Sequence, residues 1–305
     1  MSKTRSIITL GSFDGVHRGH QAIFKKIVAR ARARQAVPTA LVFGVPPRYV
    51  GKHMERWLLT TLDEKKARLK ALGIRRLQVL VFDKKTAGTS PEDFFLKTIL
   101  GRHGAVEMVV GPRLTFGKNR AGRLPLLRRL GRAHDVKIHV ISGVGRGPHV
   151  SSSRIRAVLQ KGDVEAASEA LGYPYEVSGR VVSGDHRGRK LGFPTANIEP
   201  DAGKLLPPGV FWVYVEPLKR YGLCNIGTRP TFATAAPRVT MEVYVFGKVR
   251  SLYRRRLTVR FLRRLRGEKK FASAAALVRQ IQSDVTRAKA LSADRQAGQP
   301  GRDSL

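Results

Sequence analysis

The sequence has one cysteine, few acidic residues, few aromatic residues and no long apolar run. Cys224 stands alone among 305 residues, which excludes a disulfide framework and fits a reducing cytoplasm. No apolar run approaches the roughly 20 residues that a membrane-spanning helix needs. The first residues lead into a strand pattern without the apolar region of a signal peptide. These absences predict a soluble, cytoplasmic protein with no membrane partner.

Acidic residues are heavily outnumbered, with 22 Asp and Glu against 58 Lys and Arg and a net charge of +36. So large an excess binds polyanions without specificity, which makes RNA or DNA a candidate partner. However, the basic residues are spread along the whole chain. Aromatic residues are only 7% of the total, and few are interleaved with the basic residues as a base-stacking surface requires. We therefore favour incidental polyanion affinity and keep a basic nucleotide- or RNA-binding protein as an alternative.

Short apolar runs alternate with amphipathic helical patterns from residue 6 to about residue 141. This alternation predicts an α/β domain with a parallel sheet covered on both faces, whose ligands bind at the carboxyl ends of the strands. The expected strands are 7–10, 39–43, 77–82, 106–110 and 137–141. The expected helices are 21–35, 62–72, 91–100 and 124–133, followed by 152–160 and 163–171.

The pattern changes after residue 172. Short β-branched or aromatic segments separated by Gly and Pro turns predict a small antiparallel β-barrel. The expected strands are 177–183, 210–215, 223–226, 239–246 and 257–261, with a closing helix at 273–289. The predicted domains are therefore 1–172 and 173–290, followed by a disordered polar tail at 291–305. The pattern predicts no particular oligomeric state.

A decapeptide from Gly11 to His20, Gly-Ser-Phe-Asp-Gly-Val-His-Arg-Gly-His, lies between an apolar run and a helical pattern. Its glycines let the backbone turn sharply and approach a ligand, and the helix N-terminus offers unpaired N–H groups. The turn is therefore a candidate phosphate site. Within it, His17 and His20 would stabilise charge on a transferring phosphoryl group. The alternative is a glycine-rich turn that carries two surface histidines.

A second candidate lies late in the first half, at Val-Ser-Ser-Ser-Arg-Ile-Arg, residues 150–156. Serine hydroxyls such as that of Ser152 and the start of a helix bind phosphate oxygens, and Arg154 can clamp them through two hydrogen bonds. Alone, the segment is better explained by a serine that caps a basic helix.

The second half contains a basic, glycine-rich loop at residues 179–197. Its glycines permit the loop to fold over a phosphate chain, and its basic residues suit an anion. Thr195 and Asn197, two apart in an extended segment, project to one face and present oxygen ligands for a hard cation such as Mg²⁺. A basic hairpin without a ligand is the alternative. The candidate phosphate-binding residues of the loop are Gly184, Gly188, Lys190 and Gly192.

The decapeptide resembles the GxFDGxHxGH motif of the HxGH nucleotidylyltransferases, in particular the bacterial bifunctional riboflavin kinase/FMN adenylyltransferase (FAD synthetase) family. Residues 151–156 resemble the Ser-Ser-Thr-Arg-Ile-Arg element of that family. The resemblance implies a Rossmann-like domain that transfers AMP from ATP to FMN, with the triphosphate bound by His17, His20, Ser152 and Arg154. By the same resemblance, the other ATP-binding residues of the turn are Gly11, Phe13, Asp14, Gly15 and Gly19.

The segment Gly184–Asn197 is similar to the GxxxGxxLGFPTAN motif of riboflavin kinases, and residues 225–232 match a further element of that family. Glu242 stands where those kinases have their catalytic glutamate. Phosphorylation of the ribityl hydroxyl needs such a proton acceptor. The alternation Met241-Glu242-Val243 places the carboxylate on the face opposite its apolar neighbours. The resemblance implies a second ATP site with Mg²⁺, and riboflavin, FMN and FAD as substrates or products.

Several positions depart from the family pattern. Residues 43–48, Phe-Gly-Val-Pro-Pro-Arg, lack the usual acidic residue and histidine, and residues 111–117 lack the usual aspartate. Arg254 replaces a glycine in a later turn. Because the changes in the first half fall on the flavin side, adenylylation could be slow, altered in acceptor or lost. A riboflavin kinase with such a changed first module is therefore a further alternative.

Overall fold

The computed structural model describes residues 4–44, 56–81, 83–142, 150–184, 188, 191–229 and 238–297. The chain forms two compact units, residues 1–152 and residues 153–305, and each is described by itself. The family-specific segments 45–48 and 230–232, residue Lys190 and the end of the predicted tail at 298–305 lie outside the described residues.

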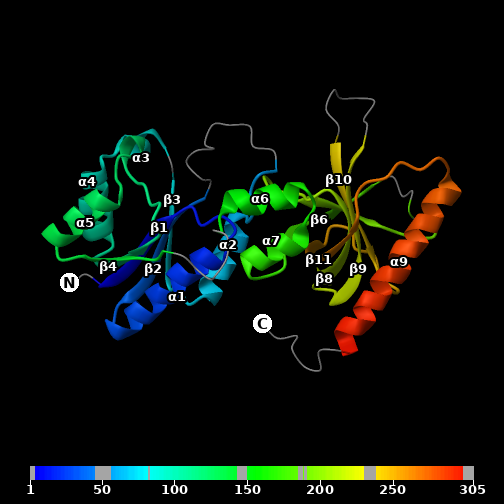
Figure 1. Cartoon of the computed structure of the whole chain (residues 1–305), viewed down its shortest axis with the longest axis horizontal. Coiled ribbons are helices and arrows are strands. Elements are labelled where there is room, and N and C mark those ends of the chain that lie inside the picture. Colours follow the sequence, from blue (N-terminus) through cyan, green and yellow to red (C-terminus); the bar gives the residue numbers. More distant parts are fainter. Residues whose placement is uncertain are drawn as a thin grey trace. The chain divides into compact units, whose positions relative to one another are not determined.

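The first unit is built on a five-stranded parallel sheet with the order β3-β2-β1-β4-β5 (Figure 1). The strand order reverses between β1 and β4, and crevices at such points receive ligands in open α/β sheets. Each expected strand is present, with bounds that agree with the expected ones to within two residues. The strands are β1 (Ser6–Gly11), β2 (Val37–Phe43), β3 (Arg76–Leu80), β4 (Ala105–Val110) and β5 (Lys137–Val140).

Helices cover both faces of this sheet, as predicted. One apolar core forms where α1 and α2 pack beneath Ile7 and Val42, and the other where η2 and α5 pack against Ile8 and Leu41. The helices are α1 (Arg18–Ala33), α2 (Leu62–Ala71), α3 (Lys84–Gly88), α4 (Pro91–Asp93), η2 (Phe94–Arg102), η3 (Lys118–Arg120) and α5 (Leu124–Ala133).

Two helices of the first unit differ from their predictions. The expected helix 21–35 begins three residues earlier, because the His17 ring caps its N-terminus. The expected helix 91–100 starts at Pro91 after a Ser90 cap, but continues from Phe94 as a π-helix. A serine cap followed by proline is a helix start that the sequence displays, whereas nothing in the apolar spacing distinguishes a π-helix from an α-helix.

The second unit is dominated by a closed six-stranded barrel with the order β10-β7-β6-β11-β8-β9, whose strands pair antiparallel. The antiparallel barrel was predicted, but β7 was not, because it contains only one β-branched residue, Ile198. The strands are β6 (Glu176–Val182), β7 (Ala196–Pro200), β8 (Gly209–Glu216), β9 (Arg220–Arg229), β10 (Arg238–Val245) and β11 (Arg256–Arg266). Helices α6 (Ser152–Gln160) and α7 (Val164–Leu171) precede it, and α7 contacts β11.

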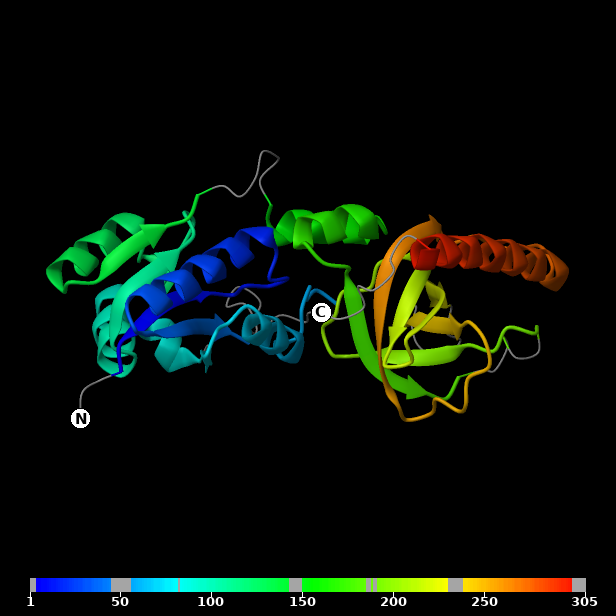
Figure 2. The same ribbon diagram turned by 90° about the horizontal axis from the view of Figure 1, so that it is seen from below.

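The closing helix α9 (Ala274–Ala297) lies along β9 of the barrel (Figures 1 and 2). It extends eight residues past its expected end at Lys289, so the prediction of a disordered tail from residue 291 is wrong for residues 291–297. The reason is a buried anchor in the last turns. Ser292 accepts a hydrogen bond from the Trp212 indole Nε1 at 2.9 Å and donates to the Ala288 carbonyl at 2.7 Å.

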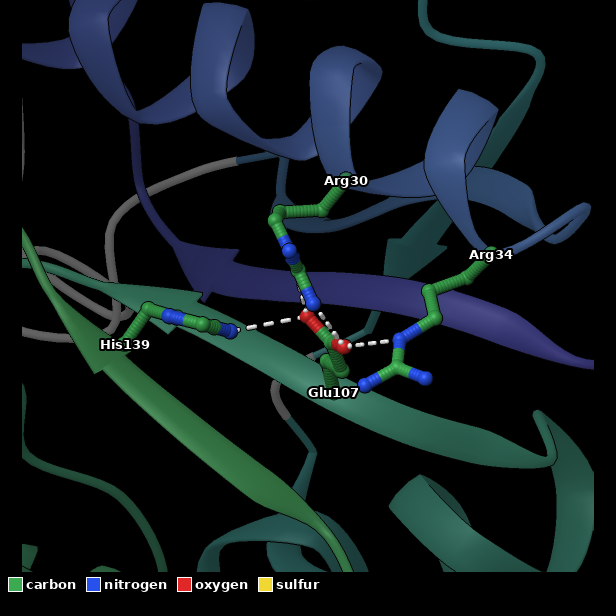
Figure 3. A network of polar contacts seen from close by, with 4 residues as sticks. All are labelled: Arg30, Arg34, Glu107 and His139. Carbon is green, nitrogen blue, oxygen red and sulfur yellow. Dashed lines mark hydrogen bonds and ion pairs between the residues drawn. The ribbon is translucent and has the colours of Figure 1, made fainter.

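A buried carboxylate fixes α1 to the sheet of the first unit (Figure 3). Glu107 on β4 is 2% exposed and accepts hydrogen bonds from Arg30 Nε at 2.7 Å and Arg34 Nε at 2.8 Å. His139 Nε2 on β5 lies 2.7 Å from the same carboxylate. Hydrogen bonding from Arg30 overcomes burial and, with His139 and Arg34, lowers the pKa of Glu107 from 4.5 to about 2.

Replacing Glu107 with glutamine is expected to reduce the free energy of unfolding of the first unit by about 2 kcal/mol at pH 7. The amide NH₂ is a donor, so it would face guanidinium N–H groups that have lost their acceptor, and only the amide oxygen would still accept. Because the folded pKa lies below the unfolded value of 4.5, this stabilisation is fully present above pH 4.5 and is lost as the pH falls through about 2. Urea denaturation at pH 7 and at pH 3 measures both effects. Asp63→Asn removes an exposed charge pair with Lys66 and should change stability by less than about 0.5 kcal/mol.

Candidate functional sites

The predicted phosphate turn lies between the end of β1 and the start of α1, at the carboxyl edge of the sheet. Gly15 has a φ of +83°, and Phe13 and Val16 are also in the left-handed region, at +46° and +35°. Only a tight reversal produces three such angles within four residues. The turn therefore brings the backbone N–H groups of the α1 N-terminus to the ligand edge of the sheet.

The two histidines of the motif come together at the start of α1. Their rings stack with centroids 3.6 Å apart and planes inclined by 19°, and His17 Nδ1 accepts a 3.4 Å hydrogen bond from the His20 backbone N–H. Gly19 leaves room for this, since a Cβ there would lie 3.2 Å from the His17 ring. Burial lowers the pKa of His20 well below 6.5, and the charges of His17 and Lys65 lower it further. His20 is therefore a neutral hydrogen-bonding group at pH 7.

Within the described residues, the buried Nδ1 atom of His20 has no hydrogen-bond partner. A buried polar atom left without a partner costs free energy, and such atoms are concentrated at sites that receive a ligand. The edge of the Phe13 ring packs against the His20 ring, with centroids 5.1 Å apart at 87°. Phe13 is thus placed to orient His20, which the motif alone did not reveal.

Asp14 has a structural role that its position in the motif did not predict. Its Oδ1 atom accepts hydrogen bonds from the backbone N–H groups of Leu59 at 3.1 Å and Thr60 at 3.0 Å. The Thr60 hydroxyl in turn accepts from the Gly15 N–H at 3.0 Å. These contacts fasten the turn to the segment before α2, 45 residues away in the sequence. Leu59 and Thr60 belong to no motif, so sequence reasoning missed them.

The serine- and arginine-containing segment also reaches the turn. Ser152 Oγ donates a 2.8 Å hydrogen bond to the backbone carbonyl of Asp14, so this predicted residue lies at the first site. Arg154 is an exposed residue of α6 and belongs to the second unit. The pairing of Ser152 and Arg154 around one phosphate chain stays a prediction.

A second polar cluster lies on the outer surface of the barrel. Glu242 on β10 is directly opposite Asn197 on β7 and Asn225 on β9, so the three side chains share one face. Thr195 Oγ1 donates a 3.3 Å hydrogen bond to Glu242 Oε2. The neighbours of Glu242 on β10 are buried in the barrel, which confirms the face predicted from their alternation. Asn225 was not singled out as a site residue in the sequence.

Two described glycines of the loop, Gly184 and Gly188, lie tightly against this cluster. A Cβ on Gly184 would overlap the side-chain amide of Asn197, and a Cβ on Gly188 would lie 3.1 Å from Thr195 Oγ1. Gly192 has a φ of +84°, which favours glycine. A hydroxyl, an amide carbonyl and a carboxylate form the kind of oxygen donor set that a hard cation such as Mg²⁺ prefers. The residues present therefore fit the predicted metal.

A cavity of about 300 Å³ adjoins the Thr195–Asn197 segment. That volume is at the lower end of small-molecule sites. Its walls come from the ends of β6, β7 and β10 and from residues 247–253, and the Tyr253 side chain on its rim is 46% exposed. An apolar wall with an exposed aromatic side chain beside oxygen donors suits an organic phosphate ligand.

The chain resembles known proteins over nearly its full length. A family model described as FAD synthetase matches residues 1–154, and one described as riboflavin kinase matches residues 171–292. A bifunctional riboflavin kinase/FMN adenylyltransferase of Pseudomonas fluorescens is 34% identical over 94% of this chain and 93% of that protein. The protein of that name from Bacillus subtilis (strain 168) is 33% identical over 92% and 91%. The chain belongs to the bifunctional riboflavin kinase/FMN adenylyltransferase family.

Membership of this family confirms the resemblance drawn from the motifs and the predicted succession of an α/β domain and a β-barrel. A solved structure named as a macrolide-efflux protein from Streptococcus pneumoniae is 28% identical, with a TM-score of 0.86 over 95% of each chain. Among the described residues of this family member, no helix is long and apolar enough to span a membrane.

One departure from the family pattern places a non-glycine residue in the left-handed backbone region. Arg254 has a φ of +63°, its N–H donates to the Val181 carbonyl at 3.0 Å, and Val181 N–H donates to the Arg255 carbonyl at 2.9 Å. The turn is therefore held in a conformation that glycine adopts more easily.

Arg254→Gly is expected to raise the free energy of unfolding by about 0.5–1 kcal/mol, because relief of the left-handed strain exceeds the entropy that glycine gains in the unfolded chain. Arg255→Gly provides the matched control, since Arg255 is not among the residues with positive φ. That control should lower stability by about 0.5–1 kcal/mol. Thermal unfolding of both variants measures these changes in stability. Equal changes in the two variants would show that the left-handed backbone of Arg254 is not strained.

Proposed function

We propose that this chain phosphorylates riboflavin with ATP to give FMN, and then transfers AMP from a second ATP to FMN to give FAD and pyrophosphate. The observation that carries the proposal is the Thr195–Asn197–Glu242 oxygen cluster beside a cavity, on a barrel that matches the riboflavin kinase family model. The stacked histidine pair at the turn supports the second reaction.

In the kinase reaction, Glu242 accepts the proton of the ribityl hydroxyl as its oxygen attacks the γ-phosphorus of ATP, and ADP leaves. Thr195 and Asn197 would hold Mg²⁺, which supplies charge neutralisation of the phosphates when bound. Gly184, Gly188 and Gly192, together with Lys190, bring N–H groups and a positive charge to the phosphate chain. The 3.3 Å contact between Thr195 and Glu242 keeps the proton acceptor beside the predicted metal ligand.

In the adenylyltransferase reaction, a phosphate oxygen of FMN attacks the α-phosphorus of ATP, and pyrophosphate departs. No covalent intermediate is required, so positioning and charge stabilisation carry the rate. His17, His20 and the N-terminus of α1 bind the phosphate oxygens on which charge develops. The predicted partners Ser152 and Arg154 bind the same triphosphate of ATP. The turn itself is shaped by Gly11, Phe13, Asp14, Gly15 and Gly19.

The changed residues in segments 43–48 and 111–117 make a kinase with an altered first module the second candidate. Purified protein incubated with riboflavin, ATP and Mg²⁺, and resolved by chromatography, separates the candidates. FMN followed by FAD supports the proposal. FMN that accumulates without FAD supports the altered first module.

Absence of both flavin products would favour the basic nucleotide- or RNA-binding protein. If flavin products do form, salt-sensitive RNA binding that competes with flavin turnover would support a nucleic-acid role. We place the activity in the cytoplasm, which supplies ATP and keeps a lone thiol such as Cys224 reduced.

A further inference from the structure

A lysine that belongs to none of the motifs is buried beside the first site. Lys65, on the first turns of α2, is 1% exposed. Its ammonium donates a 3.0 Å hydrogen bond to the backbone carbonyl of Phe43, the last residue of β2. Because β2 lies next to β1 in the parallel sheet, Phe43 ends at the same ligand edge as the Gly11–His20 turn. Lys65 is thus a buried positive charge at the phosphate end of the first unit.

The segment that carries Lys65 is fastened to the turn at several points. Leu59 and Thr60, directly before α2, bind the Asp14 carboxylate, and Thr60 also binds the Gly15 N–H. The capping box between Thr61 and Glu64 then fixes the start of α2. The position of the Lys65 ammonium relative to the turn is therefore set by short, buried contacts.

The charges of this region act on one another. The Asp14 carboxylate favours the charged form of Lys65, against the larger effect of burial, which lowers its pKa. The positive charge of Lys65 in turn helps to lower the pKa of His20. The Asp14 carboxylate already accepts from two backbone N–H groups, so it offsets Lys65 only in part. The Lys65 ammonium is thus a fixed positive charge that acts on His20, whose Nδ1 atom has no hydrogen-bond partner within the described residues.

Packing alone does not require a charge at this position. A methionine side chain would fill the same space without the cost of burying an ammonium, and one carbonyl acceptor uses only one of three N–H groups. An anionic ligand at the turn would give the buried ammonium a second anionic partner beside Asp14. With His20 neutral, positive charge for that ligand has to come from other residues, and Lys65 is one that lies in the same unit.

We propose that Lys65 is a further substrate-binding residue of the adenylyltransferase site, and that its ammonium is a fixed charge that attracts the phosphate chain of ATP. This inference rests on the proposed function of the same site. It assigns to α2 a direct part in the reaction, whereas the motifs place the chemistry on α1 and α6.

The test compares Lys65→Met, Lys65→Gln and Lys65→Arg in the full chain. Glutamine keeps a donor for the Phe43 carbonyl but has no charge. The methionine and glutamine variants are expected to raise the KM for ATP in FMN-to-FAD conversion by at least about tenfold, and arginine by much less. Conversion of riboflavin to FMN by the same sample verifies that the second unit is folded, and urea denaturation compared with the unaltered chain verifies that the first unit is folded. Lys66→Met, which removes an exposed neighbouring lysine, should change KM by less than about twofold.

A second measurement responds to charge rather than to folding. The ring signal of His20 in nuclear magnetic resonance, assigned by its loss in His20→Ala, is titrated with pH and with pyrophosphate. Lys65→Gln should raise the pKa of His20 and weaken pyrophosphate binding, and both effects should fade at high salt. An unchanged KM together with unchanged pyrophosphate binding in the folded glutamine variant would overturn the proposal. If the unaltered chain makes no FAD, the function fails, and pyrophosphate binding alone still decides the role of Lys65.

Discussion

Glu242→Gln is expected to reduce the rate of FMN formation from riboflavin by about 10²–10⁴-fold, the range typical for loss of a general base. Glutamine has the same shape and can still accept the hydrogen bond from Thr195 through its amide oxygen. The substitution therefore removes the proton acceptor while the strand pairing with β7 and β9 stays intact. Timed chromatography of the flavins measures the effect.

The same variant should convert FMN to FAD at the normal rate, because that reaction is assigned to the first unit. Glu199→Gln is the matched control, since Glu199 is an exposed carboxylate on the adjacent strand β7 and lies outside the proposed site. Normal kinase turnover in Glu242→Gln, or an equal loss in Glu199→Gln, would remove Glu242 as the base. A loss confined to kcat, with KM for riboflavin unchanged, would assign the carboxylate to the chemical step.

The general fold followed from the sequence because local patterns and tertiary structure agree over most of the chain. The apolar runs of the first unit fill both faces of a parallel sheet, and the β-branched segments of the second close a barrel. Prediction failed where local composition opposed the tertiary environment. The polar end of α9 looked disordered, yet Val285, Ala288 and Ser292 repeat at helical spacing and are buried. That spacing could have revealed the longer helix.

The sites were predictable to the extent that their residues lie within one short segment. The Gly11–His20 turn and the Thr195–Asn197 pair were each visible as one peptide. The contacts of Asp14 with Thr60 and of Lys65 with Phe43 join segments 46 and 22 residues apart, and no periodicity encodes them. Asn225 was missed for the same reason, since only strand register brings it opposite Glu242.

His20→Ala is expected to reduce FMN-to-FAD conversion by about 10²–10³-fold, the usual cost of removing one donor to a developing negative charge. Riboflavin phosphorylation should be unaffected in the same sample. His134→Ala is the control, because His134 is an exposed histidine of the same unit at the end of α5. Equal FAD yields from His20→Ala and the unaltered chain would dismiss this role.

The dependence of the first unit's stability on pH provides an independent test of His20, because losing His20 should lower the activity but reduce the unit's sensitivity to acid. Because the folded pKa of His20 lies well below 6.5, the unfolded chain binds the proton more readily, and the stability of the unit falls as the pH drops below 6.5. His20→Ala removes that penalty, so urea denaturation at pH 5 and pH 7.5 should differ less than in the unaltered chain. If His20 served only to pack the turn, His20→Ala would lower activity and stability together at every pH. If His20 is a binding residue whose pKa is lowered by burial, His20→Ala lowers the activity and also makes the stability of the unit less sensitive to acid.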